Sequence, residues 1–233
     1  MSSPQSDEKL KQLVAIASAS SLAALPLALP LWRTEVLFSV ASLSPAILNA
    51  TAGRSVWRSL SQTVNTEGVR SLYRGALPLM LHYASLNALR LHLKQRTGLS
   101  SIERVGVVAA ASAVAHPLLL VATRLAVRTG PVESIGVKAV AGEFSSIART
   151  AGLRGFAPGL PLSLLLSVGN VMCLSDKNLA WPWFAAALPL TVVQRHLMVQ
   201  GVDGIPQRYR NSLHAASVIV QNEGVGGLVR SAR

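Results

Sequence analysis

The sequence is poor in charged residues, aromatic residues and cysteine. Charged residues make up 14% of the 233 positions, whereas a soluble domain carries about a quarter. The single cysteine, Cys173, excludes a disulfide within the chain. Half of the residues are hydrophobic and the mean hydropathy is +0.41. These features indicate a membrane protein rather than a soluble domain.

Motifs for catalysis and metal binding are also missing. The sequence has no Gly-x-Ser-x-Gly element, no P-loop and no Gly-x-Gly-x-x-Gly element after a strand. Its five histidines are scattered, and even His82 and His92 are ten residues apart, too far for a pair of ligands on one helical turn. We therefore expect no enzyme activity, no metal site and no catalytic cofactor.

Long apolar segments replace these motifs. A membrane-spanning helix needs about 20 apolar residues. Five windows approach this length with little charge: Leu13–Trp32, Gly75–Leu89, Val105–Thr123, Gly155–Ser175 and Asn178–Gln194. A sixth run, Val36–Gly53, is interrupted by Pro45. Hydropathy alone makes it a short span, whereas the repeat pattern described next places it in a connection.

Three segments of the chain share one pattern. Each has a proline within an apolar stretch, at Pro30, Pro117 and Pro189. A motif that begins with glycine follows after 38, 35 and 35 residues (30 to 68, 117 to 152 and 189 to 224). A constant interval favours one supersecondary unit used three times. The repeats cover about 11–98, 99–176 and 177–233 of one domain spanning 1–233, and the third is the shortest.

The third repeat carries the most informative motif. It reads Pro-Leu-Thr-Val-Val-Gln-Arg-His over 189–196 and Glu-Gly-Val-Gly-Gly-Leu-Val-Arg over 223–230. This pattern resembles the signature of the mitochondrial carrier family. The resemblance implies an all-α membrane protein with a carrier-like pseudo-threefold bundle. We expect about five transmembrane helices plus short amphipathic matrix helices, in a degenerate and truncated member that lacks the sixth membrane helix.

This register predicts where the helices lie. The first membrane helix runs from about Lys11 past Pro30. The other predicted membrane helices cover about Gly75–Lys94, Ile102–Val127, Phe156–Leu174 and Lys177–Met198. The predicted surface helices cover about Val56–Thr66, Lys138–Arg149 and Asn211–Gln221.

The gate charges of the family are missing from this sequence. In carriers, an acidic residue two positions after each proline pairs with a basic residue of the next repeat and closes the matrix side. Here the acidic positions hold Trp32, Leu119 and Thr191, and the basic positions hold Glu35, Ala122 and Gln194. No pair of the expected sign can form, so we expect that the chain does not transport.

The helices that would line a substrate site are also nearly uncharged. His82, Asn87 and Arg90 on the second membrane helix are weak candidates for substrate contacts, and a lone histidine there is more often a packing residue. Tyr73-Arg74-Gly75 matches the aromatic-basic-glycine element of the family, which implies bound cardiolipin or another phospholipid. An interfacial anchor explains Tyr73 and Arg74 equally well.

The basic residues are unevenly distributed. The long connections after the three prolines and the tail of the third repeat hold 15 of the 22, including Arg33, Arg74, Arg124 and Arg195. Because they bracket apolar segments, they fit the positive-inside rule better than a nucleic-acid-binding face. We expect a multi-pass protein of the mitochondrial inner membrane with its long basic loops facing the matrix.

These observations favour a non-transporting, carrier-derived accessory subunit. We expect it to be structural, with the bilayer and the subunits of a large inner-membrane respiratory complex as its partners. Two alternatives stay open: an active carrier for an unusual neutral solute, and an outer-membrane carrier homologue that acts as a docking factor.

Overall fold

The computed structural model describes residues 28–51, 55–95, 100–130, 136–175, 177–202 and 204–232, and this part of the chain is entirely helical apart from its turns and loops. In chain order the elements are a helical stretch over 28–39, η1 (Ala41–Leu43), α2 (Pro45–Ala50), α3 (Val56–Glu67), η2 (Val69–Tyr73), α4 (Ala76–Gln95), α5 (Ser101–Val127), α6 (Val137–Ala151), η3 (Gly152–Phe156), α7 (Leu160–Ser175), η4 (Lys177–Leu179), α8 (Ala180–Met198), α9 (Ser212–Glu223) and η5 (Val225–Ala232).

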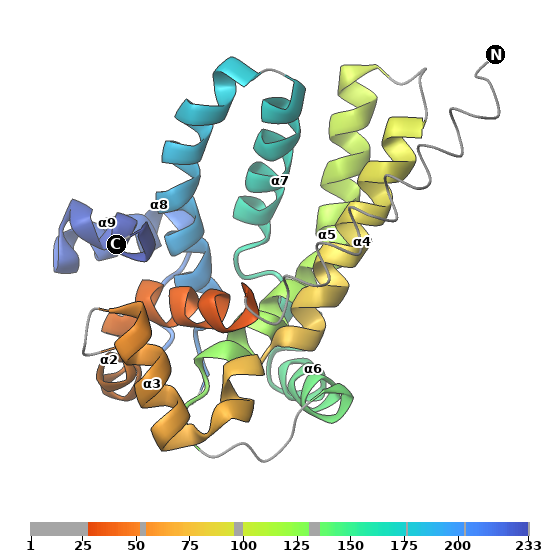
Figure 1. The fold of residues 1–233 in the computed structure, drawn as a ribbon. Helices are drawn as coiled ribbons and strands as arrows, with labels where there is room; N and C mark the ends of the chain where they lie inside the picture. The colour runs from red at the N-terminus through yellow and green to blue at the C-terminus, as the bar shows by residue number, and fades with distance from the viewer. Residues whose placement is uncertain are drawn as a thin grey trace.

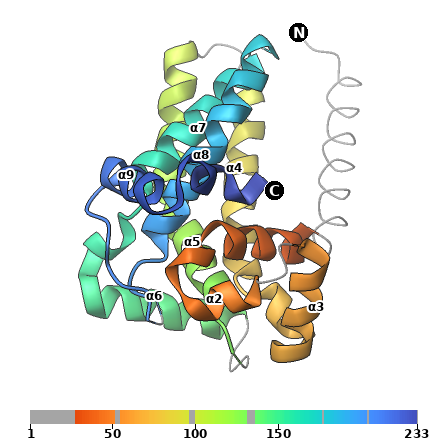
Figure 2. The same ribbon diagram turned by 90° about the vertical axis from the view of Figure 1, so that its left-hand side faces the viewer.

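Four long helices form two hairpins. α4 packs against α5, α5 against α7, and α7 against α8. The short helices α2, α3 and α6 lie together at the lower end of the molecule in both views (Figures 1 and 2). α9 lies higher and packs against α8. The arrangement therefore has two upright hairpins above a layer of short helices.

The three motif glycines each end a surface helix. Gly68, Gly152 and Gly224 follow α3, α6 and α9, with φ angles of 84°, 61° and 72°. Each donates its backbone N–H to the carbonyl four residues earlier. Glycine reaches this left-handed conformation without a steric penalty, so it ends helices well. The predicted surface helices agree with the observed ones to within two residues.

The start of α5 is fixed by its own sequence. Ser100 accepts a hydrogen bond from the backbone N–H of Glu103, whose carboxylate in turn accepts one from the backbone N–H of Ser100. This reciprocal pair is a capping box. Helix α7, by contrast, begins four residues later than predicted, because η3 and the turn through Pro158 and Gly159 occupy the expected first turn.

Two predictions about membrane spans have different outcomes. Within the described residues, one helix, Ile102–Val127, is long and apolar enough to cross a membrane. Residues 137–170 would add a second if their two segments, which are bent by 59°, form one span. The expected number of about five spans stays a prediction. Within the run Val36–Gly53, the described residues 36–51 are divided among the end of the helical stretch, η1 and α2, which agrees with a connection rather than a span.

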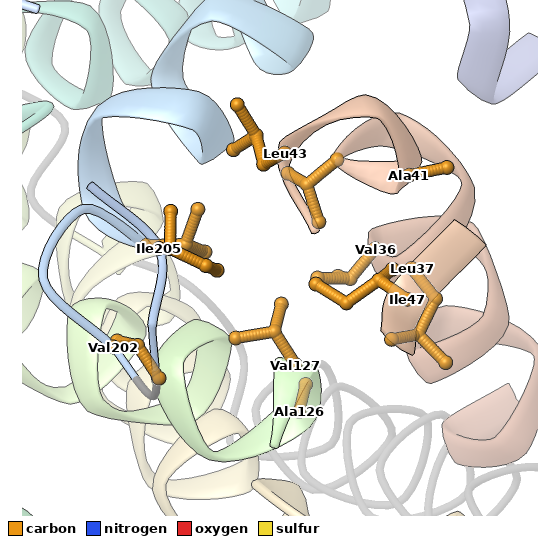
Figure 3. Close-up of a cluster of buried hydrophobic side chains, with 11 residues drawn as sticks. Val36, Leu37, Ala41, Leu43, Ile47, Ala126, Val127, Val202 and Ile205 are labelled. Carbon is orange, nitrogen blue, oxygen red and sulfur yellow. The ribbon is translucent and has the colours of Figure 1, made fainter. Parts of the chain in front are cut away.

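The largest apolar core joins all three repeats. Val36, Leu37 and Val40 of the first repeat pack with Ala126 and Val127 at the end of α5. Val199, Val202 and Ile205, which follow α8, complete the cluster. Figure 3 shows these side chains meeting from three directions. The chain segments that follow the three prolines thus converge at one place.

Candidate functional site

At the level of the prolines, the candidate gate is closed by apolar side chains. Ala122 is fully buried in a cluster with Leu29 and Leu79, and Trp32 and Leu119 pack against this cluster. We call these five residues the apolar plug. It holds three of the six gate positions: the first acidic position, the second acidic position and the second basic position.

Beside the plug, the backbones of α4 and α5 also lie very close to each other. Gly75, at the start of α4, lies against the carbonyl group of Ala122, and a Cβ atom built at Gly75 would overlap with that carbonyl oxygen. The φ angle of Gly75 is 75°, which side chains rarely tolerate. The glycine of the Tyr73-Arg74-Gly75 element thus allows α4 to approach α5 closely.

An ion pair of inverted sign joins the first and third repeats. Glu35 occupies a position that is basic in carriers, and its carboxylate lies 3.0 Å from the guanidinium of Arg195. Arg195 stands one turn after Thr191, the position that is acidic in carriers. Its side chain is 10% exposed, whereas that of Glu35 is 42% exposed. The loss of the family's charges was evident from the sequence, whereas this inverted pair was not predicted.

The remaining gate positions form hydrogen bonds. The hydroxyl of Thr191 donates to the carbonyl of Ala187 in its own helix, at 2.8 Å. The amide of Gln194 donates to the hydroxyl of Ser163 on α7. Neither residue forms an ion pair in the described structure.

A buried histidine continues the hydrogen bonds of Gln194. The Nδ1 atom of His116 lies 2.7 Å from the Ser163 hydroxyl, and its Nε2 atom lies 3.0 Å from the carbonyl oxygen of Pro158. A carbonyl only accepts, so Nε2 carries the proton. When His116 is neutral, its Nδ1 atom accepts from the Ser163 hydroxyl, and the hydrogen bonds then connect Gln194 to Pro158 through Ser163 and His116. No sequence motif singled out Ser163 or His116.

Two arginines that closely follow plug residues in sequence bind the ends of neighbouring helices, and their side chains are 1% (Arg33) and 14% (Arg124) exposed. Arg33 donates to the carbonyls of Ala126 and Arg128, at 3.0 and 3.1 Å. Arg124 donates to the carbonyls of Met198 and Gln200, at 3.1 and 2.8 Å. In both cases the acceptors are the ninth and eleventh residues after a proline (117 to 126 and 128; 189 to 198 and 200).

A side chain of the third repeat binds a backbone carbonyl of the first repeat in a similar way. His196 donates from Nε2 to the carbonyl of Ser39, at 2.8 Å, while its Nδ1 atom lies 3.1 Å from the hydroxyl of Tyr209. Ser39 is again the ninth residue after its proline (30 to 39). We call Arg33, Arg124 and His196, with their carbonyl acceptors, the carbonyl clamps. They connect repeat one to two, two to three and three to one.

Each arginine clamp is neutralised by a buried carboxylate. Glu67 lies 2.9 Å from Arg33 and 3.7 Å from Arg74. Glu143 lies 3.4 Å from Arg124 and also pairs with Arg128. A buried charge is costly unless it is paired, so these carboxylates make the buried arginines tolerable. Arg33, counted by sequence among the basic residues of the loops, is only 1% exposed.

The lipid-binding candidates already have partners within the protein. The guanidinium of Arg74 donates to the carbonyls of Arg128 and Gly130 and lies beside Glu67. Tyr73 packs against the apolar plug. Binding of a phospholipid at this element stays a prediction, and Arg74 could contribute to it only in addition to these bonds.

The substrate candidates do not share a site. His82 is buried, and its Nδ1 atom lies 3.0 Å from the carbonyl of Ala115, so it ties α4 to α5. Asn87 lies on an exposed part of α4, and the side chain of Arg90 falls outside the described residues. Among the described residues there is also no group of three or more metal-binding side chains.

The geometry by itself defines the structural class of this protein. It is an all-helical bundle in which three proline-centred segments converge, with a candidate gate at the level of the prolines. Residues 6–97 match the family model described as mitochondrial carrier protein. This segment of the chain is therefore similar to the mitochondrial carrier family. The search of curated proteins found no match.

Proposed function

We propose that this carrier-derived protein does not transport solutes and serves as a structural accessory subunit of a respiratory complex in the mitochondrial inner membrane. The observation that carries the proposal is the apolar plug, which stands where carriers need breakable ion pairs. The carbonyl clamps support it further, because they join all three repeats at the same end of the bundle.

Transport by alternating access requires the closed end to open in every cycle. Opening the plug would expose Leu29 and Leu79, which are 6% and 3% exposed, without forming a compensating contact, and re-exposing one large buried side chain costs about 1.5–3 kcal/mol. Opening would also break the clamps, whose arginines would leave Glu67 and Glu143. A state that is disfavoured by several such terms is populated too rarely to carry flux.

The bundle and the basic connections that this chain retains are compatible with an accessory role. A rigid bundle with long basic connections suits a multi-pass protein whose loops face the matrix. Phospholipid, including cardiolipin, would contact the start of α4 near Tyr73 and Gly75, and neighbouring subunits would cover the remaining helix faces. The plain carrier function of the family is the alternative that this proposal replaces.

Transport is tested with purified protein in proteoliposomes. Vesicles loaded with a panel of anionic, cationic and neutral metabolites are assayed for exchange of labelled solute, with an active mitochondrial carrier reconstituted in parallel. We expect no saturable exchange. The Thr191→Asp variant should stay equally inactive, because Glu35 cannot pair with an added acid. Saturable uptake by the unmodified chain would overturn the proposal.

The accessory role is tested by native electrophoresis of mitochondrial membranes solubilised in mild detergent. We expect the chain to migrate with a respiratory complex. As a control, the Arg58→Gln variant should comigrate to the same extent if the bundle, rather than surface charge, makes the contact. Migration as a free monomer in intact preparations would contradict the accessory role, whatever the transport result.

A further inference from the structure

The buried core of the apolar plug has a polar counterpart one repeat later. Leu29, Leu79 and Ala122 form that core, and they lie one residue before a proline, four residues after a glycine and five residues after the next proline (30 to 29, 75 to 79 and 117 to 122). The same three offsets, applied one repeat later (117 to 116, 159 to 163 and 189 to 194), give His116, Ser163 and Gln194. We call these three residues the polar triad.

The two sets of residues are equivalent in structure as well as in sequence. Gly75 and Gly159, from which the middle offset is counted, have φ angles of 75° and 77°. Each precedes a long helix by one residue, since α4 begins at residue 76 and α7 at residue 160. α4 packs against α5 and α7 packs against α8, and in both cases the second helix belongs to the following repeat. The same contact is therefore apolar between repeats one and two and polar between repeats two and three.

The polar triad is held by hydrogen bonds within a dry environment. The Ser163 hydroxyl lies 2.7 Å from Nδ1 of His116 and accepts a hydrogen bond from the amide of Gln194. All three side chains are buried, and His116 is 1% exposed. Water can replace hydrogen bonds of this kind when helices separate, whereas the apolar side chains of the plug gain nothing from water. We call the contact between α7 and α8 at the triad the seam.

No carboxylate in the described part of the chain balances a charge on His116. The carboxylates of the elements packed against α5 are Glu35 and Glu143, and arginines pair with both. α7 carries no charged residue between 160 and 175. On α4, His82 binds the carbonyl of Ala115, directly before His116, so a charge on His82 would oppose one on His116. The described basic side chains of the other neighbouring elements are bonded elsewhere or exposed, and are Arg33, Lys138, Arg149, Arg154, Arg195 and His196.

We propose that His116 is a proton-binding site that controls the seam. A proton on Nδ1 removes the acceptor of the Ser163 hydroxyl and creates a cation between helices where no carboxylate neutralises it. A buried ion without a partner is costly, and in a membrane segment such a residue is retained for function. Separation of α7 from α8 relieves this cost by admitting water. The plug stays closed because it has no group that titrates, so the inference is independent of whether the chain is an accessory subunit.

The test compares equivalent helix pairs in the full-length protein, reconstituted in phosphatidylcholine vesicles. In a Cys173→Ala background, spin labels at Leu165→Cys and Ala186→Cys report the distance between α7 and α8. Labels at Leu81→Cys and Val114→Cys report the distance between α4 and α5 at the same offsets (159 to 165 and 75 to 81; 189 to 186 and 117 to 114). All four positions are exposed.

Double electron–electron resonance gives both distance distributions at about pH 7.5 and about pH 5, on either side of the usual histidine pKa of about 6.5. We expect the population with a longer α7–α8 distance to increase several-fold at the lower pH, while the α4–α5 distribution stays unchanged. His116→Gln keeps a donor and an acceptor but cannot titrate in this range, so it should abolish the response. His82→Gln is the matched control and should preserve it.

A second variant copies the plug into the seam. His116→Leu, Ser163→Leu and Gln194→Ala together place the side chains of the plug core at the triad, and the seam should then stay closed at both pH values. Melting temperatures at both pH values show whether this variant folds. If it does not fold, the comparison of His116→Gln with His82→Gln decides the question.

Three results would overturn the proposal. An α7–α8 distance that does not change between the two pH values would show that the seam does not respond to protons. A response that persists in His116→Gln, or that is lost in His82→Gln, would assign the proton to another group. Equal changes in both helix pairs would indicate a general effect of acid on the bundle.

Discussion

The apolar plug and the carbonyl clamps lie in the same bundle but use opposite chemistry. The plug, at the level of the prolines, consists of Leu29, Trp32, Leu79, Leu119 and Ala122 and carries no charge. The clamps contain arginines and carboxylates with little solvent exposure, and the carbonyl acceptors of the arginines lie nine and eleven residues after the prolines. Charge is thus absent from the plug and, apart from the Glu35–Arg195 pair, is present where contacts hold helix ends together.

The difference follows from what each contact has to do. An ion pair at a gate is useful because water can replace its partners when the gate opens. An arginine bonded to the carbonyls at the end of a helix satisfies groups that have no partner within that helix. Such a bond stabilises the closed bundle permanently, so its value does not depend on a transport cycle.

The largest effect is expected from removing the carboxylate of the first clamp. Glu67→Gln leaves Arg33, which is 1% exposed, without its counter-charge, and breaking a buried pair in this way costs about 3–5 kcal/mol. The melting temperature in detergent should fall strongly. Glu143→Gln is the matched comparison and should cost less, because Arg128 is 40% exposed and can turn to solvent. Equal shifts for both variants would show that burial of the arginines does not set the cost.

The plug can be tested through Gly75. Gly75→Ala adds a Cβ that overlaps with the carbonyl of Ala122 at a residue with φ of 75°, and overpacking typically costs about 1–3 kcal/mol in addition to about 1–2 kcal/mol for the left-handed conformation. Gly68→Ala is the control: its φ is 84°, but a Cβ would meet no atom within 4 Å. Only the conformational cost is expected there, so Gly75→Ala should lower the melting temperature more.

The ion pair between Glu35 and Arg195 should contribute less to stability than the contacts removed by Glu67→Gln or disturbed by Gly75→Ala. Glu35 is 42% exposed, and exposed pairs contribute about 0.2–1 kcal/mol. Glu35→Gln should therefore lower stability by no more than about 1 kcal/mol, and this loss should shrink at high salt. Arg195→Gln should cost more, because Arg195 is buried and also donates to Ser39. A salt-independent loss for Glu35→Gln would show that the pair does not act through its charge.

The smallest effect on stability is expected from Tyr209, which contacts His196 of the third clamp, and it appears only at alkaline pH. Burial raises the pKa of Tyr209 above its usual value of about 10. The folded state then holds the phenolic proton more tightly than the unfolded state, so this contribution is complete below pH of about 10 and is lost as pH rises further. Titration of tyrosinate absorbance should show one late-titrating tyrosine that disappears in Tyr209→Phe. A normal titration of Tyr209 would place it in solvent.

Sequence predicted most of the helices because their signals are local. The repeat register predicted α4, α5 and α8 to within about three residues, and the glycines at 68, 152 and 224 marked the ends of the surface helices. The late start of α7 was missed because Pro158, Gly159 and Pro161 were read as part of a continuous apolar window. The resemblance to the carrier family also came from these repeated local motifs.

The candidate site was only partly predictable. Sequence identified the six gate positions and their lost charges, but not what replaced them. In sequence, Arg33 and Arg58 look alike, yet one is buried in a clamp and the other is exposed. His116 could have been noticed as a polar residue beside Pro117 in an apolar span, whereas nothing marked Ser163 as its partner.

The sequence by itself determined most of the described helices and their order, because backbone hydrogen bonding and hydrophobic patterning act over a few residues. Only the tertiary structure decided which charges are internal and which face outwards. Arg33 meets the carbonyl of Ala126 across 93 positions, and His196 meets that of Ser39 across 157. Partners so far apart are chosen by how the three repeats converge, and this packing depends on the whole chain at once.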